Sequence, residues 1–403
     1  MSAPADRSNG HLPGSTELRR LNLAMLAAGI AAFGALYSTQ ALMPALGAEF
    51  DVSATQSSLT VSAGTGALAL AVVPMSMVAE AYGRAVTMRV GFCALTLLIV
   101  ASALAPTFGV LVALRALLGV AVAAVVGVAM GHVGAEVHPR AVGSAMGLYV
   151  AGNSLGGIGG RLVSAGLYDA FDWRVAQAAI GLMCTISFVI FWINLPTPLN
   201  QRPAGDPRAV VHDAVDHVRN PMLVALYGVP FLLMGGFVAT YNYMTFRLEG
   251  PPFDLPSSIV SLVFLAYLSG TAASVVAGKL ADRVGRPPVL CGAIVTMGLG
   301  LAVTIPDWLP TVVLGAIILT TGFFAAHSAA SGWVPRLARA PATIASAIYV
   351  LGYYAGSSVF GTGVGIAWSH GGWPATVAAV GGLVALDLIC SVGVTALART
   401  RQL

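Results

Sequence analysis

The feature that most constrains this chain is a succession of long apolar runs, separated by short segments that hold most of its charged residues. A helix that crosses the hydrocarbon core of a bilayer needs roughly 20 apolar residues, and each run reaches about that length. The runs lie at about 21–47, 56–78, 86–104, 108–132, 142–163, 174–195, 221–245, 257–278, 288–305, 310–333, 342–366 and 374–397. The sequence therefore predicts an all-α membrane protein of 12 transmembrane helices.

The composition fits a surface that is covered by lipid. Hydrophobic residues make up 57% of the chain and charged residues only 9%, far too few to keep a soluble protein of this size hydrated. The 4 cysteines lie inside apolar runs with no metal-ligand spacing, so we interpret them as packing residues. We expect no cofactor and no metal, and no enzyme activity.

The basic residues sit at the ends of the apolar runs and indicate the topology. With the N-terminus inside, 16 of the 20 fall on the cytoplasmic side and only Arg161, Arg174 and Arg247 on the outer side. This bias predicts cytoplasmic termini in a bacterial inner (plasma) membrane, and it argues against nucleic-acid binding. We interpret residues 1–20 as a cytoplasmic tail that precedes an uncleaved first helix.

The two halves of the chain repeat. The segment AEAYGR at 79–84 lies 202 residues before ADRVGR at 281–286, and DWRVAQAAIG at 172–181 lies 200 before GWPATVAAVG at 372–381. The repeat predicts two six-helix bundles with a substrate site near the midplane. The expected domains are a tail at 1–20, bundles at 21–195 and 220–398, a central cytoplasmic loop at 196–219 and a C-terminal tail at 399–403.

The loop GKLADRVGRPP combines glycines, an acid and arginines at fixed spacing between two apolar runs: Gly278, Asp282, Arg283, Gly285 and Arg286. It resembles the cytoplasmic loop that marks the major facilitator superfamily. The resemblance implies that family's fold, with this loop taking part in gating. A simple charged turn is the alternative interpretation.

The first-half copy of this loop departs from the family pattern. Glu80 replaces the aspartate and Ala81 stands where an arginine is usual, although Gly83 and Arg84 remain. The expected gating role is correspondingly less well defined in this half.

Arg115 stands well inside an apolar run, four residues before Gly119. An arginine at such a position is costly and needs an acceptor or water. The motif resembles the family's helix 4 motif, which implies a role in proton coupling or substrate contact. The alternative is a side chain that extends to the membrane interface.

The fifth run is rich in glycine, which gives it a smooth face, as Gly152, Gly156, Gly157 and Gly160 show. It resembles the helix 5 motif of the antiporter branch, which packs against a helix of the other half. The usual proline is replaced by Gly157. Ordinary packing of small residues is the alternative.

Polar and aromatic residues gather in runs 7, 10 and 11, in YNYMTFR, AAHSAASGW and IYVLGYYAGSS. Together with the motifs above, these runs resemble the YnfM-like group of the drug and sugar efflux (proton antiporter) branch. Apolar side chains with polar tips suit amphipathic solutes, although some will be interface anchors instead. The predicted substrate cavity contains Tyr37, Gln40, Arg115, Asn153, Tyr241, Asn242, His327, Tyr353 and Tyr354.

The candidates for proton coupling are Arg115, His327 and Asp387. A histidine titrates near physiological pH, and a hydrogen-bonded core group is the alternative interpretation of His327. An acid inside the membrane is functional by default, although Asp387 also suits a helix-pairing role. The first run has no acid, whereas many proton-coupled relatives place one there. Glu136 is a further candidate for this missing group.

The sequence as a whole predicts a monomeric secondary transporter in the lipid bilayer that exports small amphipathic solutes in exchange for protons. The alternatives are uptake by symport or facilitated diffusion and, from another class, a membrane receptor or scaffold. An intramembrane enzyme is a third alternative, but no nucleophile–base pair supports it.

Overall fold

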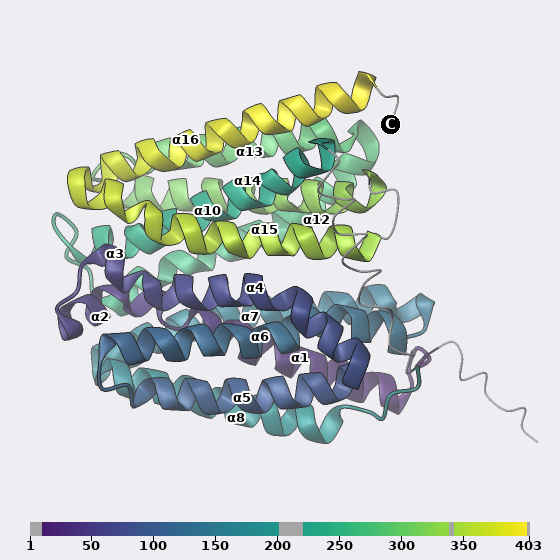
Figure 1. Cartoon of the computed structure of the whole chain (residues 1–403). Helices are drawn as coiled ribbons and strands as arrows, with labels where there is room; N and C mark the ends of the chain where they lie inside the picture. Colours follow the sequence, from purple (N-terminus) through teal and green to yellow (C-terminus); the bar gives the residue numbers. More distant parts are fainter. Residues whose placement is uncertain (1–9, 201–220, 338–341, 401–403) are drawn as a thin grey trace, which may run out of the picture. The chain divides into compact units, whose positions relative to one another are not determined.

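The computed structural model describes residues 10–200, 221–337 and 342–400, and these ranges are almost entirely helical (Figure 1). Most of the expected central loop, the first nine residues and the last three lie outside the described residues. The expected membrane protein built from helices is therefore confirmed.

The first half begins with α1 (Thr16–Tyr37), which starts five residues before the expected position. After it come η2 (Gln40–Leu42), α2 (Met43–Phe50), α3 (Ala54–Ser57), α4 (Leu59–Tyr82), α5 (Arg84–Ala103), α6 (Phe108–Glu136), α7 (Pro139–Ala170) and α8 (Trp173–Asn194). The single run expected at 21–47 is thus broken after Tyr37.

The second half follows the same plan. It contains α10 (Pro221–Glu249), α11 (Ser257–Ser261), η3 (Leu262–Ala266), α12 (Tyr267–Val284), α13 (Arg286–Val303), α14 (Leu309–Leu337), α15 (Ala342–Gly363) and α16 (Gly365–Thr400). Non-helical backbone at Gly371 and Gly372 kinks α16 before the apolar part of that helix.

Ten helical segments of the described ranges are long and apolar enough to cross a membrane. The long helices α7 and α15 are not among them, and they correspond to the fifth and eleventh predicted runs. The glycines and polar residues of α7 lower its mean hydropathy.

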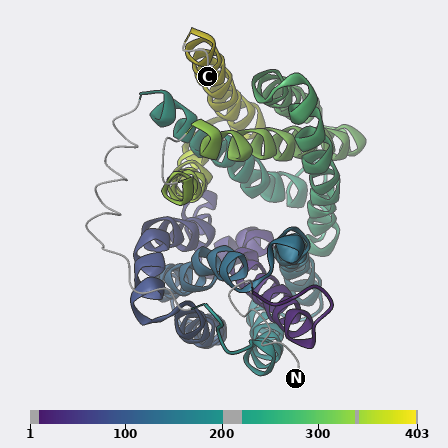
Figure 2. The same cartoon turned by 90° about the vertical axis from the view of Figure 1, so that its right-hand side faces the viewer.

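The described residues form two compact units. Unit 1 consists of Met1–Thr39 and Leu70–Asp206, and unit 2 of Gln40–Ala69 and Pro207–Leu403. The long helices of each unit run side by side in Figure 1, and Figure 2 gives the view after a turn of 90°. Segment 40–69 belongs by sequence to the first half, but it packs with unit 2 because α2 and α3 contact α10 and α16.

The sequence repeat reappears as a repeat of backbone conformation. Gly83 precedes α5 with a φ of 95°, and Gly285 precedes α13 with a φ of 93°. Residues with a Cβ rarely adopt such angles, so glycine is required at both turns. The offset of 202 residues therefore marks equivalent turns in the two halves.

Helix α7 packs directly on the backbone of α1. A Cβ at Gly152 would lie 2.6 Å from the carbonyl oxygen of Leu26, and one at Gly160 would lie 2.6 Å from that of Gly34. Gly156 faces the Ile30 backbone between them, whereas Gly157 lies beside the Arg161 guanidinium. These glycines were expected to contact the other half, but three of them contact α1 within unit 1. Small residues at this spacing let two helix backbones approach closely.

Candidate functional site

Arg115 is fully buried in unit 1. Its Nη1 donates to the carbonyl oxygen of Ala35 at 2.8 Å, and its Nη2 donates to that of Leu36. These carbonyls belong to the last turn of α1, where a helix leaves acceptors without intrahelical partners. The guanidinium therefore caps the broken first helix, and a side chain that reaches the interface is excluded by its burial.

The break after α1 is polar and buried. Ser38 Oγ donates to Gln177 Oε1 at 3.0 Å and lies 3.0 Å from the Ala35 carbonyl oxygen. Neither Ser38 nor Thr39 has any exposed surface. A helix that ends inside the protein needs such partners, and here α6 and α8 supply them.

Arg161 is a second buried cation of unit 1, and the sequence analysis missed it by placing it at an outer end. It is 2% exposed, donates from Nη1 to the Gly157 carbonyl oxygen at 2.6 Å, and stacks 4.4 Å from the Tyr37 ring. The run expected at 142–163 ends two residues after Arg161, whereas α7 continues to Ala170 and so places Arg161 well within a helix. Asn153, on the same helix, faces Gly29 of α1.

Gln40 and Asn242, here called the amide pair, meet in unit 2. Gln40 Nε2 donates to Asn242 Oδ1 at 2.7 Å, and Asn242 Nδ2 donates to the Gly361 carbonyl oxygen at 3.1 Å. Both side chains are fully buried. The two residues are 202 positions apart, which is the offset of the repeat.

Two further hydrogen bonds tie segment 40–69 to α15. Ser58 Oγ donates to Thr362 Oγ1 at 2.9 Å, and Ser358 Oγ donates to the Ser62 carbonyl oxygen at 2.7 Å. Several hydrogen bonds thus join segment 40–69 to α10 and α15, and the amide pair is the most buried of them.

An aromatic cluster brings together most of the predicted cavity residues of the second half. His327 lies 5.0 Å from the Tyr353 ring, and Tyr353 lies 5.1 Å from the Tyr354 ring. Tyr241 is joined to them through a stacked pair of phenylalanines on α10 and α14, and its hydroxyl lies 2.6 Å from Thr320 Oγ1. Tyr349 Oη is in hydrogen-bond contact with His327 Nδ1 at 2.9 Å.

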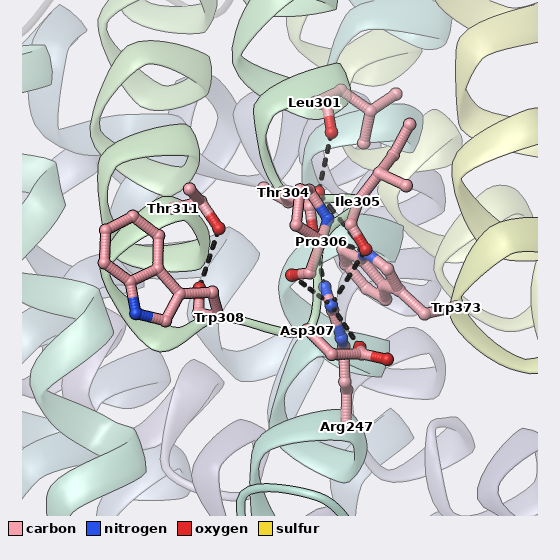
Figure 3. A network of polar contacts seen from close by, with 9 residues as sticks. All are labelled: Arg247, Leu301, Thr304, Ile305, Pro306, Asp307, Trp308, Thr311 and Trp373. Carbon is pink, nitrogen blue, oxygen red and sulfur yellow. Dashed lines mark hydrogen bonds and ion pairs between the residues drawn. The ribbon is translucent and has the colours of Figure 1, made fainter.

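Figure 3 shows a second site that sequence reasoning missed, around Arg247 at the end of α10. The side chain is 4% exposed and donates to the carbonyl oxygens of Thr304, Ile305 and Pro306 and to Asp307 Oδ1 at 2.8 Å. It also stacks 4.9 Å from the Trp373 ring. Arg247 therefore caps α13, as Arg115 caps α1.

At the equivalent place in unit 1, after the end of α5, the arginine comes from α8. Arg174, half-buried, stacks 4.2 Å from Trp173 and donates to the Ala105 carbonyl oxygen at 3.2 Å. Trp173 corresponds in the repeat to Trp373. Both halves thus place an arginine between a tryptophan and the end of the third membrane helix.

The two copies of the signature loop also differ. Arg286 lies 3.8 Å from Asp282 and donates to the Ala329 carbonyl oxygen at 3.3 Å, while Arg283 is exposed. Gly278 lies beside Ser328 of α14. In the first-half copy, within the described ranges, no ion pair joins Glu80 to Arg84.

Glu136 and Asp387, the two acids that the sequence offers for proton coupling, differ in their hydrogen bonding. Glu136 accepts hydrogen bonds from the backbone N–H groups of Leu199, at 2.6 Å, and Asn200, at 3.1 Å. Asp387 of α16 is 1% exposed, and neither of its carboxylate oxygens has a hydrogen-bond partner among the described residues. Glu136 therefore anchors the segment that follows α8, whereas Asp387 is unsatisfied.

Long apolar helices in two repeats, with buried charge and a broken first helix, define a polytopic membrane protein of the transporter class. The family model described as Major Facilitator Superfamily matches residues 25–359, and the chain belongs to this family.

Relatives and solved structures agree. The chain is 38% identical to the uncharacterized MFS-type transporter YybF of Bacillus subtilis, with 89% of each chain covered. It is 36% identical to the inner membrane transport protein YnfM of Escherichia coli, with 93% of this chain and 89% of that one covered. A crystal structure of the peptide transporter POT has the same fold, with a TM-score of 0.77 at 12% identity over 98% of this chain and 97% of that one. The chain is therefore a multi-pass membrane protein and a secondary transporter of this family.

Proposed function

We propose that this chain is a proton-coupled exporter of small amphipathic solutes, such as drugs, sugars or metabolites, that works by alternating access. It belongs, in this proposal, to the YnfM-like group of the drug and sugar efflux branch. It acts as a monomer in the bacterial inner membrane with both termini in the cytoplasm. The motifs of the sequence and the likeness to YnfM over nearly the whole chain support this assignment.

The observation that carries the proposal is the amide pair. Gln40 belongs by sequence to the first half and Asn242 to the second, 202 positions further on, and both residues pack within unit 2. Their side chains form a hydrogen bond with no exposed surface. To open the solute path at this end, the bond must break together with the other contacts of segment 40–69.

The aromatic cluster of unit 2 is the proposed contact surface for the solute. Tyr241, His327, Tyr353 and Tyr354 combine flat apolar faces with polar atoms, which suits amphipathic molecules. Arg115, by contrast, caps α1 within unit 1. The proposed substrate residues of unit 2 thus combine apolar faces with polar atoms.

The test is transport by purified protein in liposomes with an imposed pH gradient, screened over amphipathic drugs and sugars. We expect at least one solute to move against its own gradient and opposite to the proton flow, and a protonophore to abolish that movement. Solute that accumulates together with protons would assign uptake instead. Transport that is indifferent to the pH gradient would refute proton coupling.

A further inference from the structure

Asp387 differs from the other buried charges of the described residues because nothing compensates it. Both carboxylate oxygens lack a hydrogen-bond partner, and so does Ser391 Oγ, one turn further along the same face of α16. Both residues are buried, Asp387 to 1% exposure and Ser391 completely. An ionised carboxylate in such surroundings would cost far more than a neutral acid, so the group holds a proton here.

The titratable groups that interact with Asp387 come from three helices that pack together. They are Cys291 of α13, Tyr349 of α15 and Cys390 of α16 itself. All three are neutral at physiological pH when unperturbed, and none is a cation that could balance a carboxylate. A helix-pairing role would require hydrogen bonds from a neighbouring helix, and the carboxylate has none.

Tyr349 connects this acid to the aromatic cluster. Its single hydroxyl hydrogen serves one acceptor at a time, and Tyr349 Oη now contacts His327 Nδ1 at 2.9 Å. Among the described residues no hydrogen bond joins Tyr349 to Asp387, so an ionised Asp387 would act on this hydroxyl through its charge. The protonation of Asp387 thereby alters the polarity of the contact between Tyr349 and His327.

We propose that Asp387 is the group of unit 2 that binds the coupling proton, and that Tyr349 transmits its charge state to His327 at the solute-contacting cluster. The step is a simple exchange, in which the carboxylic acid releases one proton to water when its surroundings open and recovers one when they close. This inference rests on the proposed proton-coupled transport. A sodium ion is a poorer occupant, because it needs several oxygen ligands around the carboxylate.

The experiment is infrared spectroscopy of the full-length protein in lipid nanodiscs, titrated with acid and base. A protonated carboxyl group has a carbonyl band that an ionised one lacks. We expect this band at neutral pH in the wild type and in Asp387→Glu, and its loss in Asp387→Asn. The exposed Asp169→Asn is the matched control and should retain the band. A spectrum of Asp387→Asn identical to that of the wild type at every pH would overturn the assignment, and a sodium-dependent loss of the band would assign a cation site instead.

The role of Tyr349 has its own readout. In Tyr349→Phe the band should persist, but the pH at which it disappears should change, because the hydroxyl that senses the carboxylate is gone. An unchanged titration would remove Tyr349 from the scheme.

Failure of the inference can be separated from failure of the proposed function. If the wild-type band behaves as expected but no pH gradient drives solute movement, the proton site stands and the exporter proposal falls. If the wild type and Asp387→Asn export solute equally well with the gradient, the exporter proposal stands and the proton site falls.

Discussion

Unit 1 buries Arg115 and Arg161, and each guanidinium donates to carbonyl oxygens of membrane helices. Unit 2 buries Asp387, whose oxygens accept nothing among the described residues. The two units descend from one repeated plan, as the turns at Gly83 and Gly285 show, so the difference lies in the side chains rather than in the fold. A satisfied charge holds a structure together, whereas an unsatisfied one is available for chemistry.

Arg247 sharpens this comparison, because it shows that unit 2 also satisfies its buried cation. Its guanidinium contacts three carbonyl oxygens and one carboxylate. Within residues 10–200, 221–337 and 342–400, a buried charge is therefore normally accompanied by partners, and the unpaired Asp387 is the exception.

The largest expected effect comes from Arg115→Ala. The substitution empties a fully buried site and removes the guanidinium donor from the carbonyls of Ala35 and Leu36, of which the Ala35 carbonyl keeps only the Ser38 hydroxyl nearby, at a cost of about 3–5 kcal/mol in stability. We expect a lower melting temperature in detergent and loss of transport. Arg115→Lys keeps one donor and should recover part of the stability. A melting temperature equal to that of the wild type would contradict the capping role.

Arg247→Ala and Arg174→Ala compare the stability that each arginine contributes, Arg247 at the end of α13 and Arg174 at the end of α5. The loss of four acceptor contacts at a buried position should cost about 2–3 kcal/mol. Arg174→Ala removes the contacts of a half-buried side chain with the Ala105 carbonyl and the Trp173 ring and should cost less, about 0.5–1 kcal/mol. The two variants are compared by thermal unfolding in the same detergent. Equal decreases in melting temperature would show that the two arginines contribute equally to stability.

The packing of α7 on α1 is tested by Gly156→Ala. A Cβ there meets the Ile30 backbone, so the two helices must separate, which costs about 1–3 kcal/mol. Gly159→Ala is the matched control, because a Cβ at Gly159 meets nothing within 4 Å. Thermal unfolding should separate the two variants clearly, and similar melting temperatures would argue against direct contact of the helix backbones.

Much of the fold follows from the sequence, because apolar length and the 202-residue offset are local or periodic features. The loop copies at 79–84 and 281–286 correctly indicated equivalent glycine turns. The break after Tyr37 was missed because hydropathy does not register a helix end that a distant arginine caps. For the same reason Arg161 and Arg247 were placed at outer ends, although distant groups cover them: the Tyr37 ring lies against Arg161, and the end of α13 lies against Arg247.

The candidate site was only partly accessible from the sequence. Residue types pointed to His327, its neighbouring tyrosines and Asp387, since ionisable and aromatic groups inside apolar runs are unusual. No pattern in the sequence indicated that the Tyr349 hydroxyl contacts His327. The bond between Gln40 and Asn242 was equally hidden, because it depends on which unit segment 40–69 packs against.

The most direct test of the account is a reversible cross-link at the amide pair. The double variant Gln40→Cys, Asn242→Cys is prepared with the four native cysteines replaced, then reconstituted in liposomes with a pH gradient and a solute that the wild type moves. A reducible bifunctional thiol reagent should link the two cysteines and stop solute movement, and reduction should restore it, while each single-cysteine variant is unaffected by the reagent. Undiminished transport by fully cross-linked protein would contradict the claim that this bond must open in each cycle.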